Sequence, residues 1–198
     1  MKLLAFADLH GDTRLLKKLI KRAKEKDIDL VVVAGDLTMF ESHLRYLMRK
    51  LNSIGKKVLI IPGNHESEKS LKGVVSDYKN CILFHRKALK YEDYVFLGYG
   101  EGGFSLSDAE FRKLARQWYG EFQKEKIVLV THAPPFGTEL DKLDKHHVGN
   151  KDFRKFIERI KPKLVICGHL HETAGKIDTI GEAKVVNPGW EGMVINLS

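Results

Sequence analysis

Residues 30–36 read LVVVAGD, which is five apolar residues followed by a glycine and an aspartate. A short run this rich in valine is typical of a strand that is buried on both faces of a parallel sheet. Gly35 allows the chain to turn tightly where that strand ends. The pattern therefore predicts that Asp36 lies at the carboxyl edge of the sheet, where open α/β sheets bind their ligands.

An apolar run followed by residues that can bind a metal occurs at four other places in the chain. These are Asp8-Leu9-His10, Gly63-Asn64-His65-Glu66, Thr131-His132 and Gly168-His169-Leu170-His171. Parallel strands end at the same edge of their sheet, so we expect the polar side chains to converge there. Each motif alone occurs by chance in many proteins, whereas the whole set indicates a site.

The order of the predicted elements favours an α/β fold. We expect strands at residues 2–7, 30–34, 57–61, 81–84, 94–98, 127–131 and 164–167, and helices near residues 13–23, 41–53, 67–77, 107–122 and 151–160. Residues 173–178, 183–186 and 193–197 are predicted to form antiparallel strands. Two sheets packed face to face, with helices outside them, would bury both kinds of strand.

The composition is that of a folded protein. Of the 198 residues 43% are hydrophobic, and we expect a single domain over residues 1–198. The first residues already form a predicted strand, and no apolar run approaches the ~18 residues of a membrane span. Cys81 and Cys167 lie in apolar runs, which favours buried thiols in a reducing compartment over a disulfide. We therefore expect a cytoplasmic protein that does not contact membranes.

The formal net charge of +8 leaves nucleic acid open as a partner. Lysines are spread over every predicted helix, however, and glutamine occurs only at Gln117 and Gln123. Abundant lysine and glutamate with few amides is typical of a heat-adapted surface. This second interpretation is favoured, so nucleic-acid binding is kept as the alternative, and the oligomeric state is left open.

The residue types at the five strand ends suit a pair of divalent cations. Such cations take carboxylate, imidazole and amide oxygen ligands, and an aspartate can bridge two of them. No cysteine accompanies the motifs, which disfavours a closed structural zinc site. Taken alone, His132 would more often be a hydrogen-bonded core residue, and Asp36 could be only a helix cap.

Together the motifs resemble the calcineurin-like metallophosphoesterase family, as does the run Asn187-Pro188-Gly189 near the end of the chain. The resemblance implies a four-layer αββα sandwich of two mixed β-sheets flanked by helices. It also implies two metal sites. Asp8, His10, Asp36 and His171 would hold one metal ion, and Asp36, Asn64, His132 and His169 the other, with Asp36 bridging. The metals would be manganese, iron, zinc or nickel.

The activity that the resemblance implies is cleavage of phosphoesters. A hydroxide between the two metals would attack phosphorus in line, and His65 would face the substrate and protonate the leaving group. Glu66 would either raise the basicity of His65 or lie at the surface. No large cap domain fits in 198 residues, which favours an open site and small phosphodiesters as substrates.

Two other functions remain as alternatives. A nuclease of the same superfamily would act on DNA or RNA, and its binding would weaken steeply with salt. A non-catalytic scaffold with this fold is disfavoured, because such a protein should have lost ligands and none is missing here.

Further residues are given provisional places. Phe136 and His147, in the long loop 133–150, are expected on the substrate side of the site. His43 and His85 lack a partner motif and are predicted to lie at the surface, and Trp190 is left undecided between packing and binding.

Overall fold

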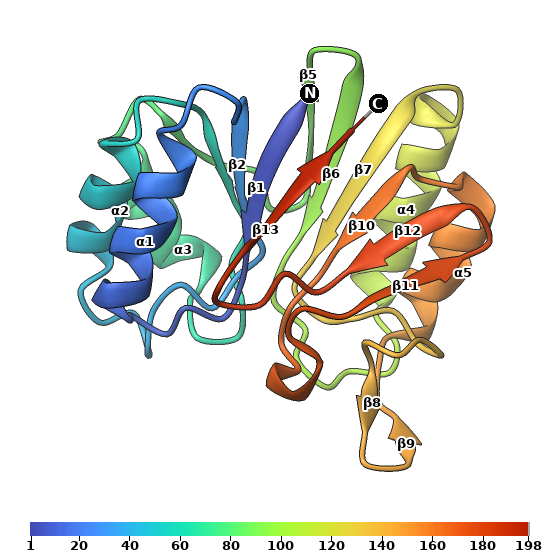
Figure 1. Cartoon of the computed structure of the whole chain (residues 1–198). Helices are drawn as coiled ribbons and strands as arrows, with labels where there is room; N and C mark the ends of the chain where they lie inside the picture. The colour runs from blue at the N-terminus through green and yellow to red at the C-terminus, as the bar shows by residue number, and fades with distance from the viewer. Residues whose placement is uncertain (198) are drawn as a thin grey trace.

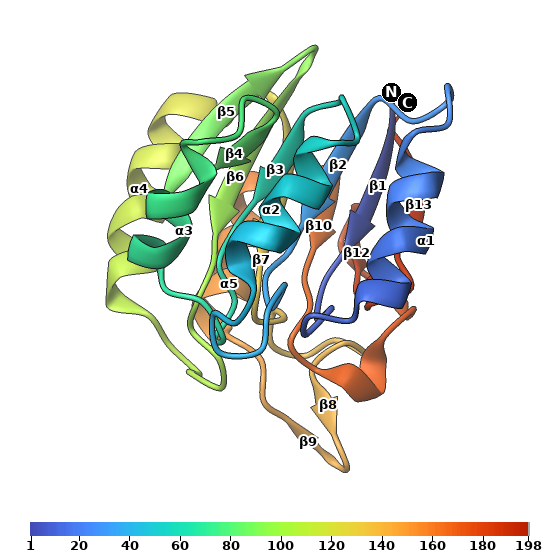
Figure 2. The ribbon, with the colours of Figure 1, turned by 90° about the vertical axis from the view of Figure 1, so that its left-hand side faces the viewer.

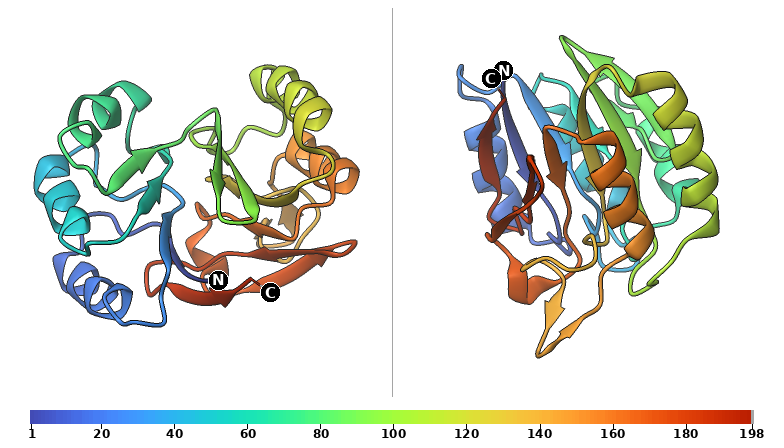
Figure 3. Two further views of the ribbon diagram at one scale, coloured as in Figure 1. Left: turned by 90° about the horizontal axis from the view of Figure 1, so that it is seen from above. Right: turned by 90° about the vertical axis from the view of Figure 1, so that its right-hand side faces the viewer.

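Two β-sheets pack face to face between two layers of helices in the computed structural model, which describes residues 1–197 (Figures 1 and 3). The first sheet has the order β13-β1-β2-β3-β4. Its strands are β1 (Lys2–Phe6), β2 (Leu30–Val33), β3 (Val58–Ile60), β4 (Cys81–Leu83) and β13 (Met193–Asn196). Strands β1 to β4 are parallel, and β13 is antiparallel to β1. The expected αββα sandwich of mixed sheets is confirmed.

The second sheet has the order β11-β12-β10-β7-β6-β5. Its strands are β5 (Lys87–Tyr91), β6 (Tyr94–Tyr99), β7 (Lys126–Thr131), β10 (Leu164–Ile166), β11 (Ile177–Ile180) and β12 (Ala183–Val186). The four inner strands are parallel, and the two edge strands are antiparallel to their neighbours. A hairpin of β8 (Lys142–Leu143) and β9 (His146–His147) projects beyond the sandwich at the bottom of Figure 1.

Helices cover the outer face of each sheet. Figure 2 shows α1 (Thr13–Ala23), α2 (Leu44–Asn52) and α3 (Glu68–Val75) on the first sheet. The second sheet carries α4 (Ala109–Phe122) and α5 (Lys151–Ile160), and the 3₁₀ helix η1 (His171–Thr173) follows β10. Asp12 caps α1, because its carboxylate accepts hydrogen bonds from the backbone N–H groups of Arg14 and Leu15. Within residues 1–197, no helix combines the length and apolarity of a membrane span.

Strand periodicity explains why three apolar layers form within the described residues. Successive side chains of a strand point to opposite faces of the sheet, so a strand that is apolar throughout supplies two cores at once. Val31 and Val33 pack against the helices of the first sheet, whereas Leu30 and Val32 pack between the two sheets. The third layer lies between the second sheet and its own helices, where Trp118 is buried.

The sequence prediction was wrong in parts of the second sheet and in the loop that carries the β8–β9 hairpin. Strand β5 and the β8–β9 hairpin were not predicted, and residues 173–178 form part of η1 and the start of β11 instead of one strand. Strand β12 is antiparallel to β11 but parallel to β10, whereas the whole tail was expected to be antiparallel. The apolar pattern shows that residues are buried but not in which direction a strand pairs, so this feature was not available from the sequence.

His85 is buried, with 1% of its surface exposed, and not at the surface as predicted, while His43 is exposed as expected. The backbone N–H of Gly100 donates to Nδ1 of His85 at 2.9 Å, so this nitrogen is the acceptor and the imidazole is neutral. Burial, together with the charges of Arg86 and Lys87, lowers the pKa of His85 to about 4. The hydrogen bond between His85 and the loop after β6 can therefore form only while the imidazole is unprotonated.

The lowered pKa of His85 determines in which direction the stability of the fold changes with pH. The unfolded chain takes up a proton near the ordinary histidine pKa of about 6.5, while folded His85 resists protonation until about pH 4. Stability from His85 is therefore complete above about pH 6.5 and is lost as the pH falls toward 4, by at most ~1.4 kcal/mol per pH unit.

We expect the His85→Asn variant to be less stable than the wild type near neutral pH and to approach it as the medium becomes acidic. The asparagine oxygen keeps an acceptor for Gly100 but has no proton to gain. Urea unfolding of both proteins between about pH 7 and about pH 4.5 measures the difference. A difference that stays constant across this range would contradict the assigned role of the imidazole.

Candidate metal centre

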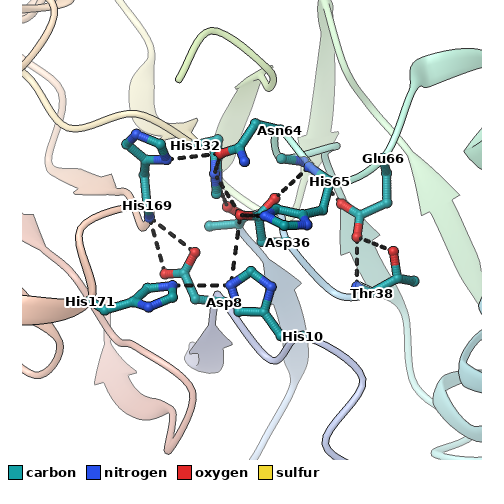
Figure 4. Close-up of polar contacts among 12 residues, drawn as sticks. Asp8, His10, Asp36, Thr38, Asn64, His65, Glu66, His132, His169 and His171 are labelled. Atoms are coloured by element: carbon teal, nitrogen blue, oxygen red, sulfur yellow. Dashed lines mark hydrogen bonds and ion pairs between the residues drawn. The ribbon is translucent and has the colours of Figure 1, made fainter. Parts of the chain in front are cut away.

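The five predicted strand ends meet at one edge of the sandwich, and their polar side chains surround a common point (Figure 4). Asp8 and His10 follow β1, Asp36 follows β2, Asn64 and His65 follow β3, His132 follows β7, and His169 and His171 follow β10. Both sheets therefore contribute side chains to this point, and the motifs converge as expected from the sequence.

The backbone at these strand ends is held in an unusual conformation. Asp8, His10, Asp36 and His169 have φ angles of 56°, 47°, 49° and 72°, in the left-handed region. Residues other than glycine adopt this region at a cost of order 1 kcal/mol or more each, and such residues gather at functional sites. The rest of the fold supports this strain, which turns each side chain sharply toward the common point.

Asp36 lies at the centre of the cluster and is 2% exposed. Its Oδ1 accepts a hydrogen bond of 2.9 Å from the backbone N–H of His65. Its Oδ2 lies 3.3 Å from Nε2 of His132, 3.8 Å from Nε2 of His10 and 3.9 Å from Nε2 of His65. One oxygen thus faces imidazoles from three strand ends.

Three overlapping groups have their ligand-type atoms within 4.8 Å of one another. The groups are Asp8 with His10 and His171, Asp36 with His132 and His169, and His10 with Asp36 and His65. Asn64 joins the second group, because its Oδ1 lies 3.0 Å from Nε2 of His132 and 2.9 Å from Nδ1 of His169. Asp/His clusters of this kind can bind metal ions.

The chemistry of the donor atoms fits divalent cations. Nε2 of His10 and Nε2 of His171 lie 3.0 Å apart, and two neutral imidazole nitrogens at this distance need a shared proton or a cation between them. Nδ1 of His10 and Nε2 of His169 are buried and have no hydrogen-bond partner within residues 1–197. Nitrogen and oxygen ligands in this number suit manganese, iron, zinc or nickel.

The ionisation of the cluster also favours positive charge at its centre. Burial lowers the pKa of His132, but its hydrogen bond and charge interaction with Asp36 outweigh this and raise the pKa to about 9. Burial opposes ionisation of Asp36, yet the same contact lowers the pKa of Asp36 to about 2. A site that stabilises a proton so strongly would also stabilise a metal cation in its place.

The other imidazoles are suited to be neutral ligands. Burial, together with the nearby charge of His132, lowers the pKa of His169 to about 4. Burial also lowers the pKa of His10. His132 donates from Nδ1 to the carbonyl oxygen of Ala34 at 2.9 Å, which fixes the ring so that Nε2 faces Asp36.

Glu66 has a role that neither sequence-based alternative anticipated. It is 4% exposed, and one carboxylate oxygen accepts hydrogen bonds from the backbone N–H (2.6 Å) and the hydroxyl (2.7 Å) of Thr38. The other oxygen accepts a hydrogen bond from the backbone N–H of Gly63 at 3.1 Å. Glu66 therefore joins the loop after Asp36 to the loop that carries His65. Only the pairing of two loops in space reveals this role, so the sequence offered no signal for it.

Phe136 and His147 contact each other, with ring centroids 5.6 Å apart. Nδ1 of His147 lies 2.7 Å from the buried carboxylate of Asp141. Neither residue belongs to the Asp/His groups found among residues 1–197, and their place on the substrate side stays a prediction. The ring of Trp190, left undecided from the sequence, lies 5.7 Å from that of His171 and lines a cavity of about 490 Å³ beside Asp8 and His10.

The chain also matches a family of known proteins. Residues 1–173 fit the family model of the calcineurin-like phosphoesterases. The chain belongs to this family. It therefore belongs to a family of metal-dependent phosphoester hydrolases that use two metal ions, and its Asp/His clusters are of the kind that binds them.

The chain is also similar to particular proteins. An uncharacterised protein of Methanocaldococcus jannaschii is 34% identical over 203 residues, which cover 95% of this chain and 88% of the relative. A probable glycerophosphodiester phosphodiesterase of Arcobacter nitrofigilis is 24% identical over 160 residues, covering 74% of this chain and 58% of the relative. The crystal structure of TT1561 from Thermus thermophilus shares the fold, with a TM-score of 0.77 at 18% identity and coverage of 96% of this chain and 90% of the other.

The close approach of Gly63 to Asp36 generates a prediction about this phosphoesterase. A Cβ atom on residue 63 would lie 2.0 Å from Oδ1 of Asp36 and 2.4 Å from its backbone nitrogen. We expect Gly63→Ala to displace the carboxylate, to reduce the affinity for Mn²⁺ in calorimetric titration, and to lower the unfolding free energy by ~1–3 kcal/mol.

Gly73→Ala is the matched control, because residue 73 lies in α3 and its added Cβ would meet nothing within 4 Å. This variant should bind Mn²⁺ normally and gain about 0.4–1 kcal/mol of stability. Normal Mn²⁺ affinity in Gly63→Ala would refute the idea that close packing at residue 63 holds Asp36 in position.

Proposed function

We propose that this phosphoesterase is a phosphodiesterase that uses two metal ions, formed as a single domain over residues 1–198. The observation that carries the proposal is the position of Asp36. Its buried carboxylate lies between an imidazole of the β1 strand end and an imidazole of the β7 strand end, at 3.8 Å and 3.3 Å. A carboxylate so placed is suited to bridge two cations.

The proposed metal ligands are those implied by the sequence motifs. Asp8, His10, Asp36 and His171 would hold one ion, and Asp36, Asn64, His132 and His169 would hold the other. When bound, such a pair of cations lowers the pKa of a coordinated water and neutralises charge on a phosphoryl group. The protein's own contribution is to fix the ligands, since the hydrogen bond from Nδ1 of His132 to Ala34 and those from the backbone N–H of His169 to Asp8 orient them.

His65 is the proposed proton donor to the leaving group. Its backbone N–H is tied to Asp36, while its side chain is partly exposed and lines a groove of about 780 Å³. The ring stands edge-on to that of His10, with centroids 4.7 Å apart. An imidazole at the border between the cluster and an open groove is placed to give a proton to an alkoxide as it departs.

The preference for diesters is supported by the open groove and by the similarity to the Arcobacter nitrofigilis relative, which is named as a probable glycerophosphodiester phosphodiesterase. A nuclease remains the second candidate, because the chain carries a formal charge of +8. The groove itself favours the first candidate, because Glu41, Glu66 and Glu101 line it together with His65 and would repel the adjacent phosphates of a nucleic acid.

We expect Asp36→Asn to lose at least one metal ion per chain and to reduce diester turnover by at least about a hundredfold. An amide has one oxygen ligand and no charge, so it cannot bridge two cations as a carboxylate does. Metal analysis of the purified protein after loading with Mn²⁺, and hydrolysis of bis(p-nitrophenyl) phosphate, measure the two effects. The factor follows from the roughly 10- to 100-fold that even supporting groups of a metal site contribute.

Asp144→Asn is the matched control, since Asp144 is exposed and also has a left-handed φ of 53°. This variant should keep the full metal content and activity. Two ions per chain together with undiminished turnover in Asp36→Asn would end the proposal of a bridging carboxylate.

The role of His65 predicts a dependence on the leaving group. We expect His65→Asn to slow hydrolysis of a dialkyl phosphodiester by about 10²–10⁴-fold, because an alkoxide needs a proton to depart. The same variant should slow bis(p-nitrophenyl) phosphate far less, because p-nitrophenolate departs without one. His146→Asn, which changes an exposed imidazole of the β8–β9 hairpin, is the control. Equal losses on both substrates would show that His65 acts structurally.

A further inference from the structure

A groove lined by three loops opens beside His65. Phe40 and Glu41 line it from the loop after β2, and residues 101–103 line it from the loop after β6. The turn from Gly63 to Ser67, which carries Asn64 and His65, also lines the groove. The groove of about 780 Å³ is therefore continuous with the candidate metal centre and has room for a group larger than a phosphate.

The exposed position of Phe40 does not favour the stability of the fold. Its side chain is 76% exposed, although phenylalanine is normally buried for its apolar surface. Its φ of 48° is in the left-handed region, which is unfavourable for a bulky residue. Its ring lies against the imidazole of His65, with centroids 4.4 Å apart and the planes inclined by 44°. A flat apolar surface is thus presented directly beside the proposed proton donor.

The charged side chains of the groove limit which chemical groups can bind in it. Glu41 accepts hydrogen bonds from the backbone N–H and the hydroxyl of Ser67, at 3.0 Å and 2.8 Å. Glu101 accepts a hydrogen bond of 3.3 Å from the backbone N–H of Glu68 and lies 3.7 Å from Arg86. Within residues 1–197, no lysine or arginine lines this groove. The carboxylates of Glu41, Glu66 and Glu101 in the lining would therefore disfavour an additional phosphate, whereas they would not repel an uncharged group.

We propose that the ring of Phe40 is a stacking platform for a flat, uncharged aromatic leaving group, of the chemical class of a nucleobase on its sugar. The proposal rests on the proposed phosphodiesterase function, because the groove adjoins the metal centre through His65. A base stacked on Phe40 would hold its sugar oxygen near His65, and the acidic rim would limit the substrate to one phosphate. Phe40 is then a specificity-determining residue.

Phe104 provides a comparison within the same site. Its ring lies 4.4 Å from that of His169, and its side chain is 58% exposed, so it resembles Phe40 in both respects. It does not line the groove beside His65, however. The same substitution at both positions therefore separates stacking in the groove from general support of a site histidine.

The first experiment uses two cyclic diesters that differ only in the base. Adenosine 2′,3′-cyclic phosphate carries it, and the 2,3-cyclic phosphate of 1,4-anhydroribitol has the same furanose ring without it. In both, water adds to phosphorus and one P–O bond to the sugar breaks, with the proton going to the departing oxygen. We expect Phe40→Ala to reduce the ratio of the two kcat/KM values by about tenfold, since stacking of one base on an aromatic side chain has this magnitude.

Phe40→Trp should retain that ratio, and Phe104→Ala should change both substrates by the same factor. An equal fall in both substrates for Phe40→Ala would show that Phe40 only positions His65 and would overturn the proposal. A similar loss of the ratio in Phe104→Ala would also overturn it, because the effect would then not belong to the groove.

A second measurement does not depend on turnover. Binding of AMP and of ribose 5-phosphate to the Mn²⁺-loaded protein is compared by calorimetry in the wild type and in Phe40→Ala. We expect the wild type to bind AMP about tenfold more tightly than ribose 5-phosphate, and Phe40→Ala to bind them alike. Equal affinities in the wild type would overturn the stacking platform even if diesters are cleaved. Preferential AMP binding without any diester cleavage would support the platform while the proposed function fails.

Discussion

The carboxylate of Asp36 is the point through which the two halves of the sandwich are joined at the candidate site. It accepts the backbone N–H of His65 from its own sheet and faces the imidazole of His132 from the other. His132 in turn donates to the carbonyl of Ala34, two residues before Asp36, so the contact between the sheets is made twice. Asp8 repeats this arrangement, because it accepts the backbone N–H of His169 across the same junction. The ligand cluster therefore exists only while the sheets are packed in one register.

This dependence explains why unfavourable local features are concentrated there. Several site residues have left-handed backbones, and two imidazole nitrogens face each other at 3.0 Å. The left-handed backbones cost free energy, and the three apolar layers of the described chain supply the stability that supports them. Gly63 is part of the same arrangement, because only a residue without a side chain allows the β3 loop to approach Asp36 so closely. A cation bound by the folded site and not by the unfolded chain would stabilise the fold further.

Much of this was open to prediction from the sequence, for a physical reason. Buried parallel strands have continuous apolar sequences, and glycine and polar residues follow them where they end. Both the strand β2 and the position of Asp36 could therefore be predicted. Strand β5 could not, because its residues Lys87–Tyr91 are half-exposed and carry no apolar run. The roles of Glu66 and His85 could not be predicted either. Each side chain accepts a hydrogen bond from a backbone N–H that is distant in the sequence, that of Thr38 for Glu66 and that of Gly100 for His85. Hydrogen-bond partners are a property of the packed chain, not of local pattern.

The same distinction applies to charge. A formal net charge of +8 describes lysines and arginines distributed over the whole chain, and it suggested nucleic acid as an alternative partner. The groove beside His65 has the opposite local character, because three loops bring Glu41, Glu66 and Glu101 to its lining. A ligand that reaches the cluster responds to these near charges more strongly than to distant ones, which salt screens beyond about 10 Å. On the proposal made above, the few side chains around Phe40 decide the specificity of this phosphoesterase, and the net charge of the whole chain does not.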